Sequence, residues 1–357
     1  MPTLAAAEAS NAAFSPSYIP VAVFAGGTSG VGQAMAEALA RQTNGRAHII
    51  LIGRNAKTAA EILARFPKPA DGDVDSDGWA HEFVACDAMS MRSVRAVCAG
   101  LRSRLQRINF LVMSAAGPKG NSMSECGETS EGLDNHLSMR YFSRYVYSKE
   151  LLPLLVRARG KGQHAHLMTV LGAGFGAPIA TTDLGLAEAR RRTIKCLQGV
   201  MFSVAALKAM IRGVEYNDGL VAWFAAQHPD IAFTHILPGQ VRTVGAVLDP
   251  GWLLAPLGWL MTRLRSLITV SQDECAQWML YALLDGERGL FIRDSHGDIV
   301  SSHVFSPDHK ARFVDDGSAT ARKAGVLNGV PMKGYGGSDA TVAGLIAYTE
   351  QVLGDIK

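Results

Sequence analysis

A glycine-rich turn close to the N-terminus constrains the fold of this chain more than any other feature. The apolar run Val21–Phe24 leads directly into Ala25–Gly32, which reads AGGTSGVG, and a helical pattern continues to Gln42. Glycines in this order allow a tight turn and a close approach of the backbone to a pyrophosphate, and the helix N-terminus offers N–H groups and the positive end of its dipole. A purely structural turn is the alternative, but the succession of strand, loop and helix favours a dinucleotide site. The residues that we expect to contact its phosphates are Gly26, Thr28, Ser29, Gly30, Val31 and Gly32.

Short apolar runs alternate with helical patterns through most of the chain. We expect strands at Val21–Phe24, His48–Ile52, Glu82–Ala85, Phe110–Met113, His166–Val170, Ile231–Leu237 and Gly289–Arg293. Helical patterns cover Gly32–Gln42, Lys57–Phe66, Ser90–Leu105, Gly132–Arg157 and Val204–Ala226. Strands that are apolar on both faces and separated by helices are typical of a parallel sheet covered on both sides. The sequence therefore predicts an α/β fold: a Rossmann-like, doubly wound parallel sheet of about seven strands with helices on both faces.

The length and composition suit one large domain with additional segments. The chain has 357 residues, of which 48% are hydrophobic, so it can bury a sizeable core. We expect an N-terminal tail over residues 1–19, a single domain over residues 20–300, and a C-terminal extension over residues 301–357 with a weak helical signal near its end. The net charge of +3 gives no basis for a nucleic-acid partner.

The cysteines and histidines indicate neither a disulfide framework nor a metal site. The five cysteines are dispersed and form no CxxC pair, and His164 and His166 flank a predicted strand without a third ligand nearby. Residues 1–20 lack the basic start and the apolar stretch of a secretory signal. These features predict a cytoplasmic protein with reduced thiols and no bound metal.

Two segments leave their roles open. A helical segment at about residues 248–285, which we expect to shape the substrate pocket, carries an apolar stretch at Trp252–Met261 that is too short to span a bilayer. This stretch is either an amphipathic helix over a lipophilic pocket or subunit interface, or a patch that touches a membrane surface. Pro118–Gly132 follows the fourth predicted strand and is either a lid over a ligand or a solvated loop.

The second predicted strand ends at Ile52 and is followed by Gly53 and Arg54. Sites that prefer NAD usually carry an acidic residue here for the ribose 2′-hydroxyl, whereas an arginine can pair with a 2′-phosphate. Arg54 therefore favours NADP(H) as the cofactor, and an ordinary exposed arginine is the alternative.

Several motifs, taken in order, resemble the short-chain dehydrogenase/reductase family. The pattern Gly26-x-x-x-Gly30-x-Gly32 follows the first strand and Cys86-Asp87 follows the third, while Ser114–Gly117 (SAAG), Leu151–Pro153 (LLP) and Pro238–Thr243 (PGQVRT) stand where the family has similar segments. The resemblance covers about residues 20–245 and is nearest to the retinol-dehydrogenase-like branch and to fungal members with a long C-terminal region. It implies further cofactor contacts from Asp87, Ser114, Ala115, Gly117, Pro238, Gly239, Val241 and Thr243, and it implies a homo-oligomer, since family members are commonly dimers or tetramers.

The same resemblance indicates that the family's four catalytic residues are replaced. In the family, a Tyr hydroxyl is the general acid or base at the substrate oxygen, and a Lys four residues on, a Ser and an Asn assist it. The family's spacing before Pro238 puts Lys208 at the Tyr position and Arg212 at the Lys position. Arg140 falls at the Asn position, and Gly172 (or, as an alternative, Leu171) at the Ser position.

Other groups could supply the missing chemistry. Lys208, Arg212 and Arg140 could together bind a carboxylate or polarise a carbonyl, or Arg140 and Lys208 could simply pair with acids across a helix interface. Tyr216 is either a displaced proton donor or a packing aromatic on its helix. Thr169 is either a hydroxyl near the site or a buried strand residue.

Three functions are consistent with these sequence features. The first is an NADP(H)-dependent oxidoreductase that acts on a small lipophilic carbonyl or alcohol with an altered proton donor. The second is a non-redox enzyme of specialised metabolism, such as a cyclase, isomerase or dehydratase, in which the cationic residues do electrostatic work. The third is a non-catalytic protein that keeps the fold and the nucleotide site.

Overall fold

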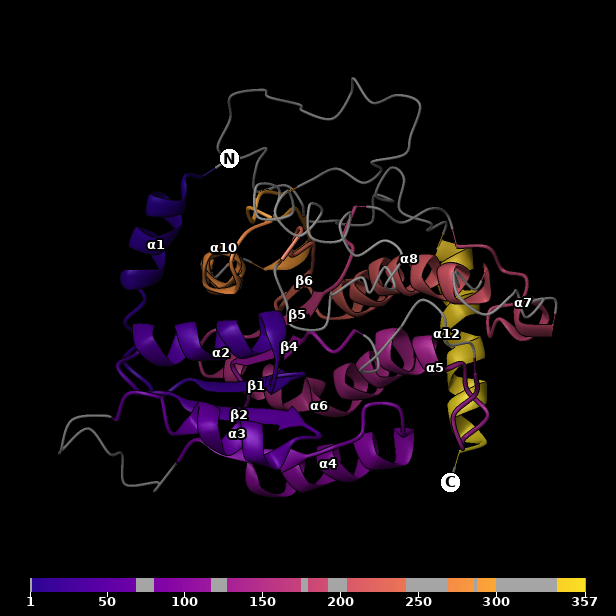
Figure 1. The fold of residues 1–357 in the computed structure, drawn as a ribbon, viewed down its shortest axis with the longest axis horizontal. Helices are drawn as coiled ribbons and strands as arrows, with labels where there is room; N and C mark the ends of the chain where they lie inside the picture. Colours follow the sequence, from indigo (N-terminus) through magenta and orange to yellow (C-terminus); the bar gives the residue numbers. More distant parts are fainter. Residues whose placement is uncertain are drawn as a thin grey trace, which may run out of the picture.

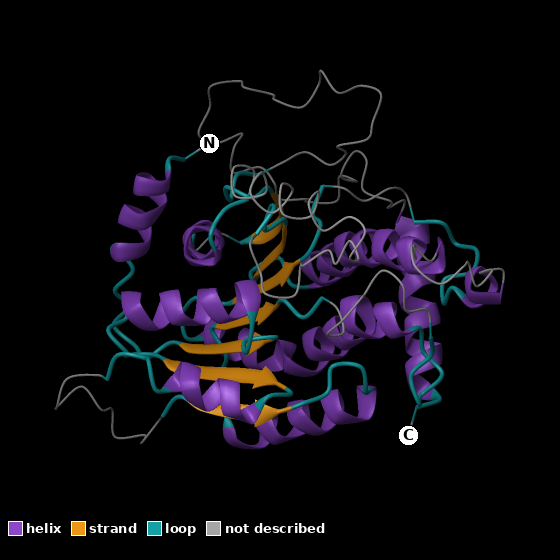
Figure 2. Ribbon diagram, in the orientation of Figure 1, coloured by secondary structure: helices purple, strands orange, loops and turns teal. Residues whose placement is uncertain are grey.

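A single seven-stranded parallel sheet organises the protein in its computed structural model, with the strand order β3-β2-β1-β4-β5-β6-β7 (Figures 1 and 2). The strands are β1 (Val21–Ala25), β2 (His48–Gly53), β3 (Glu82–Ala85), β4 (Phe110–Met113), β5 (His166–Val170), β6 (Ala232–Ile236) and β7 (Gly289–Arg293). The structure describes residues 2–68, 80–116, 127–174, 179–191, 204–241, 269–285, 288–299 and 339–356. The predicted Rossmann-like fold with about seven strands is confirmed.

Two hydrophobic cores sandwich the sheet because successive strand residues point to opposite faces. In β1, Val21, Val23 and Ala25 belong to one core, whereas Ala22 and Phe24 belong to the other. The first core is covered by α4 (Met91–Arg104), α6 (Ser143–Gly160), α8 (Val204–Gln227) and α12 (Asp339–Gly354). The second is covered by α1 (Leu4–Ala12), α2 (Gly30–Gln42), α3 (Ala56–Leu63) and α10 (Gln272–Leu284). Figure 1 shows α2 and α6 on opposite sides of the sheet.

The two ends of the chain both add a helix to these layers. Residues 1–19, expected to be a tail, contain α1, and the buried Asn11 amide donates to the backbone oxygen and the side-chain Oε1 of Gln277 on α10, each at 2.9 Å. The C-terminal extension contains α12, where Leu345 and Leu353 are buried in the first core. Alanine-rich α1 has only a weakly amphipathic sequence, so its helical pattern is hard to detect without the surface on which it packs.

The predicted single helix at Gly132–Arg157 is wrong in its first half. The chain instead forms the short helix α5 (Asn135–Leu137) and one π-helical turn, η1 (Ser138–Phe142), before α6 begins. The Asp134 carboxylate caps the start by accepting from the N–H groups of His136 and Leu137, each at 2.9 Å. The π-turn shifts the phase of the side chains that follow, which a 3.6-residue pattern cannot anticipate.

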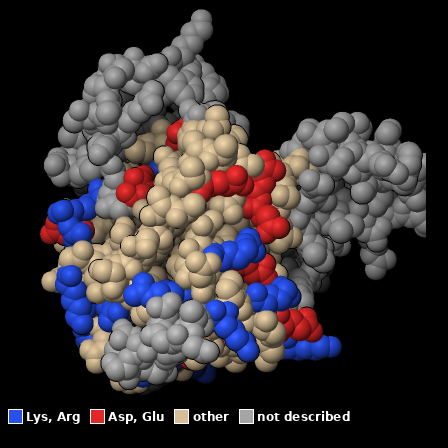
Figure 3. All heavy atoms as spheres, turned by 90° about the vertical axis from the view of Figure 1, so that its left-hand side faces the viewer, with Lys and Arg blue, Asp and Glu red and all other residues tan. Residues whose placement is uncertain are grey.

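Charged side chains of both signs lie on the outer face around α1, α2 and α3 (Figure 3). Arg65 pairs there with Glu37 at 2.5 Å, and Arg41 with Asp273 at 3.5 Å. In the part of the chain that the structure describes, no helix is both long and apolar enough to cross a membrane. Trp252–Met261 lies outside the described residues, as does most of the predicted lid at Pro118–Gly132.

His166 ties β5 to two neighbouring elements inside the second core. Its Nδ1 is 2.8 Å from the Leu283 carbonyl oxygen on α10, and its Nε2 is 2.7 Å from Thr234 Oγ1 on β6. Burial, assisted by the nearby Arg293 guanidinium, lowers the pKa of His166 from 6.5 to about 3.

We therefore expect the free energy of unfolding to fall as the pH drops from 6.5 toward 3. In that range the unfolded chain binds a proton at this histidine that the folded protein does not, with a slope of about 1.4 kcal/mol per pH unit for one full proton. His166→Gln is expected to be less stable at pH 7 but to show a flatter pH dependence, measured by urea unfolding at several pH values. The half-buried His228→Gln serves as the control, and an unchanged slope in His166→Gln would contradict the prediction.

Candidate functional site

The glycine-rich turn fits closely against the end of β4. Gly26 has a φ of 97°, and a Cβ there would lie 2.6 Å from the backbone nitrogen of Ala115. A Cβ on Gly32 would lie 2.6 Å from the carbonyl oxygen of Gly26, and it would also overlap Ser114 Oγ. The Ser114 N–H donates to the Ala25 carbonyl at 2.9 Å, so the turn is held where β1 and β4 end side by side. Neither glycine can carry a side chain without moving the backbone.

The α2 N-terminus leaves its first N–H groups without a side-chain cap, since Ser29 makes no capping hydrogen bond. Gly30, the first residue of the helix, has a φ of 60°. Thr28 packs against Gly53, where a Cβ would lie 2.5 Å from Thr28 Oγ1. An uncapped helix N-terminus beside a glycine turn is suited to bind a pyrophosphate.

Two further predicted cofactor residues, Arg54 and Asp87, follow the carboxyl ends of neighbouring strands. Arg54 follows β2, its side chain is exposed, and no acid among the described residues pairs with it. Asp87 follows β3 and is exposed, with its Oδ1 accepting from the Met89 N–H at 3.0 Å. The strand order places Arg54 on the strand next to the glycine turn of β1 and Asp87 one strand further away, at the same edge of the sheet.

The Pro-Gly segment follows β6 at the same edge of the sheet. Gly239 has a φ of 73°, Val241 bridges to Val270 in parallel, and the Pro238 carbonyl accepts from Cys275 Sγ at 3.3 Å. Gly117 and Thr243, which were also predicted to contact the cofactor, lie outside the described residues.

Buried polar side chains meet where β5, α6 and α8 pack together, on the face of the sheet opposite α2. Arg144 donates through Nη1 to Thr169 Oγ1 and, at 3.4 Å, to Asn217 Oδ1. Its Nη2 donates to the carbonyl oxygens of Ala115, at 2.9 Å, and Val170, at 3.1 Å. The Thr169 hydroxyl donates to Asn217 Oδ1 at 2.7 Å, so this predicted site residue is a fully buried part of the cluster.

Arg140 lies in η1, one helical turn before Arg144. Its carbonyl accepts from Asn217 Nδ2 at 2.7 Å, which fastens η1 to α8. A Cβ on Gly213 of α8 would lie 3.0 Å from the Arg140 Cβ and 3.2 Å from its Cδ. Gly172, just after β5, approaches the next residue of α8, where its Cβ would lie 2.7 Å from Val214 Cγ2. The structure thus brings the predicted positions 140, 169 and 172 together around α8.

The three candidates on α8 itself have different surroundings. Lys208 is exposed, between the exposed side chains of Leu207 and Ile211. Arg212 is half-buried and pairs with Glu215 on its own helix at 2.8 Å. Of these two cations, Lys208 is the one that is exposed and forms no ion pair among the described residues.

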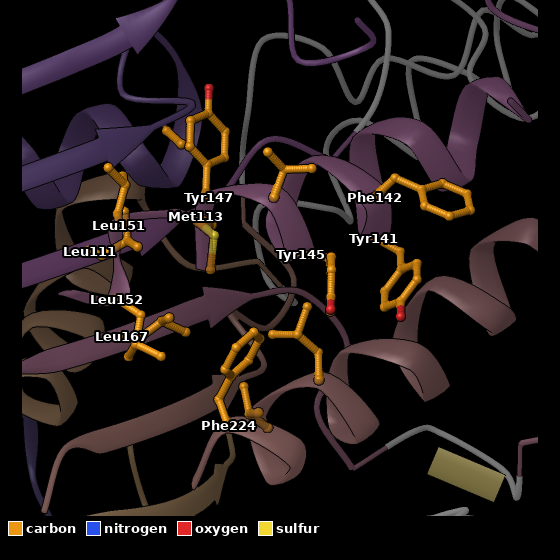
Figure 4. Packing of buried hydrophobic residues seen from close by; sticks show 14 of the residues in the cluster. Leu111, Met113, Tyr141, Phe142, Tyr145, Tyr147, Leu151, Leu152, Leu167 and Phe224 are labelled. Carbon is orange, nitrogen blue, oxygen red and sulfur yellow. The ribbon is translucent and has the colours of Figure 1, made fainter. Parts of the chain in front are cut away.

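Tyr216 is fully buried, and its hydroxyl donates to the Leu184 carbonyl at 3.1 Å. Its ring packs edge-on against Tyr141 at 5.1 Å, beside the aromatic cluster of η1 and α6 seen in Figure 4. Burial raises the pKa of Tyr216. This environment favours the packing role for Tyr216 over that of a proton donor.

Sequence reasoning overlooked Arg144, Asn217 and a buried pair on the same face of the sheet. In that pair, His235 Nδ1 on β6 is 2.5 Å from Asp218 Oδ1 on α8. The i, i+4 spacing of Arg140 and Arg144 was a usable signal, because residues four apart share a helix face. Asn217 gave no comparable signal.

Comparisons with known proteins place the chain among short-chain dehydrogenases by sequence. A sequence profile described as short chain dehydrogenase matches residues 20–176. The oxidoreductase andH of Emericella variicolor is 28% identical over 264 residues, which are 73% of this chain and 69% of that protein. An oxidoreductase of Emericella nidulans is 30% identical over 243 residues, which are 68% of this chain and 65% of that protein. The matched part thus spans about two thirds of each relative's length.

Solved structures show the same fold. The crystal structure of a short chain dehydrogenase from Shigella flexneri, complexed with NADP, aligns with a TM-score of 0.51 at 14% identity, covering 78% of this chain and 97% of that one. The chain belongs to the short-chain dehydrogenase/reductase family.

Gly32→Ala is expected to weaken dinucleotide binding at least tenfold and to lower the free energy of unfolding by about 2 kcal/mol or more, because the new Cβ overlaps the Gly26 carbonyl. Fluorescence titration with NADPH and urea unfolding measure the two effects. Gly100→Ala on α4 is the matched control: its Cβ would meet nothing within 4 Å, so it should leave binding intact and stabilise the helix by about 0.5–1 kcal/mol. Equal NADPH affinity and equal stability of the two variants would contradict the close packing of Gly32 against the Gly26 carbonyl.

Proposed function

We propose that this protein is a cytoplasmic NADP(H)-dependent oxidoreductase that acts on a small lipophilic carbonyl or alcohol. The observation that supports it best is the closure of Gly26 and Gly32 on the end of β4, where neither position has room for a side chain, directly before the uncapped N-terminus of α2. The oxidoreductases of the two Emericella species add support from sequence.

The residues present fit a dinucleotide. Its pyrophosphate would lie against the glycine turn and the uncapped N-terminus of α2, with Thr28 and Ser29 beside it. Asp87 would hold the adenine and Arg54 the 2′-phosphate, since an exposed guanidinium at the end of β2 can pair with a phosphate and an acid could not. The nicotinamide would extend toward Pro238 and Gly239, after β6.

When bound, the nicotinamide supplies or accepts a hydride. This chain's own residues would orient the substrate and handle its proton. Lys208 is the exposed cation on α8 and the candidate proton donor, while Arg212 is held by Glu215 and supplies positive charge from a fixed place. The buried cluster of Arg144, Thr169 and Asn217 would keep β5 and α8 in register behind the site.

Arg54→Glu is expected to weaken NADPH binding about tenfold to a hundredfold while changing NADH binding much less, because it exchanges a phosphate partner for a like charge. Fluorescence titration with both cofactors measures this. Arg157→Glu, an exposed substitution of the same charge change on α6, should leave both affinities unchanged. A similar loss of affinity for NADPH and NADH would show that Arg54 does not bind the 2′-phosphate.

The side chains at the positions that the family resemblance assigns to catalysis favour a second candidate, a non-redox enzyme such as a cyclase, isomerase or dehydratase. Gly172 offers no hydroxyl, and Arg140 offers charge in place of an amide. Turnover of a panel of lipophilic carbonyl compounds, followed by NADPH absorbance, separates the two. Product formation with no change in NADPH would support the non-redox enzyme and contradict the oxidoreductase.

A further inference from the structure

Two guanidinium groups are buried next to each other without an acidic partner. Arg140 keeps 9% of its surface exposed and Arg144 keeps 1%. Among the described residues, neither forms an ion pair, and the Nε of each has no hydrogen-bond partner. Burial lowers the pKa of Arg140 to about 10; burial and the charge of Arg140 lower the pKa of Arg144 to about 9. Both groups are therefore cationic at neutral pH.

Among the described residues, the buried Arg293 and the half-buried Arg212 each have an acidic partner. Arg293, 3% exposed, pairs with Asp285 at 2.5 Å and donates to the Gly297 carbonyl at 2.7 Å. Arg212 pairs with Glu215. An unpaired buried cation destabilises a fold, since desolvation of the charge is not offset by a partner. The contrast makes Arg140 and Arg144 candidates for binding an anion that the protein itself does not supply.

The two arginines are not equivalent. Arg144 uses both terminal nitrogens on neutral acceptors from β5, α8 and the end of β4, which fixes its position. The Arg140 guanidinium makes no hydrogen bond to any described residue, and its Nε is buried without a partner, whereas its backbone carbonyl accepts from Asn217. Arg140 can therefore donate to a ligand, whereas Arg144 adds a fixed positive charge behind it.

The pair lies on the substrate side of the nucleotide turn. Arg144 donates to the carbonyl of Ala115, whose backbone nitrogen is the atom against which Gly26 packs. Arg140 packs on Gly213, and the next residue of α8, Val214, packs on Gly172 at the end of β5. Ligands of open α/β sheets bind at these carboxyl ends.

We propose that the Arg140 guanidinium binds a delocalised oxyanion of the substrate, a carboxylate or an enolate, with Arg144 as a fixed second charge. This rests on the proposed function in taking the carboxyl ends of β4 and β5 as the substrate side of the cofactor. A planar guanidinium donates two parallel hydrogen bonds to such an oxyanion, which a neutral alcohol or ketone cannot accept in the same way. The substrate class is thereby narrowed to lipophilic acids and acidic enols.

The test is calorimetric titration of the full-length protein, without cofactor, at pH 8. The probes are cyclohexanecarboxylate, 1,3-cyclohexanedione as its enolate, and neutral cyclohexanemethanol. We expect at least one anion to bind ten times more tightly than the alcohol, and the anion that binds identifies the oxyanion type. Arg140→Met should remove this preference and raise the melting temperature by roughly 2–4 °C, because an unpaired buried charge is lost.

Two further variants test whether the effect is specific to the Arg140 guanidinium. Arg92→Met removes an exposed arginine on α4 and should change neither anion binding nor melting temperature. Gly213→Ala keeps every charge but displaces the Arg140 stem, so it should weaken anion binding even if Arg140→Met folds poorly. Equal binding of anions and alcohol, no binding of any probe, or anion binding unaffected by Arg140→Met and Gly213→Ala would each overturn the proposal.

A parallel NADPH titration of the same preparations separates this proposal from the proposed function. Arg140-dependent anion binding without NADPH binding would support the oxyanion site and contradict the oxidoreductase. NADPH binding without a preference for anions would support the oxidoreductase and contradict the oxyanion site.

Discussion

The contact between the turn after β1 and the end of β4 is the constraint on which the rest of the site depends. These strands are neighbours in the sheet but lie far apart in sequence, since the chain first builds β2 and β3 on one side and then returns to start the other half at β4. Gly26 fits against the backbone of Ala115 at this junction because it has no side chain. The carbonyl of the same Ala115 holds Arg144. One residue thus connects the nucleotide turn on one side with the buried cations on the other.

Much of this fold could be predicted from local pattern. Four strands begin and end at the predicted residues, β1 and β2 extend one residue further, and β6 is one residue shorter at each end, because each is a short apolar run bounded by polar or glycine residues. The errors came where packing overrides local preference. The π-turn η1 interrupts a continuous helical pattern, and α1 forms because α10 offers it a surface.

The part of the site that depends on local backbone conformation could be predicted, whereas the part that depends on contacts between distant elements could not. The glycine turn has a sequence signature because the backbone conformation itself requires glycine. Side-chain hydrogen bonds and ion pairs between distant elements have no comparable sequence signature. Arg212 pairs with a residue three positions away, but the neutral acceptors of Arg144 come from three elements spread over about a hundred residues of chain. The expectation that Arg140 pairs with an acid finds no support among the described residues, and that difference could be recognised only from the packed structure.

The position of α12 also has a consequence for how the protein is made. Its Leu345 and Leu353 complete a core whose other members lie mostly between residues 21 and 233, and Arg95 of α4 donates to the carbonyls of Leu353 and Ile356. Tyr145 and Lys149 of α6 bond to Glu350 of the same helix. During synthesis, α4, α6 and α8 therefore leave the ribosome with an apolar surface that stays uncovered until more than a hundred further residues are added. The nascent chain must pass through this incompletely packed state, which makes it a natural client for chaperones that shield apolar surfaces.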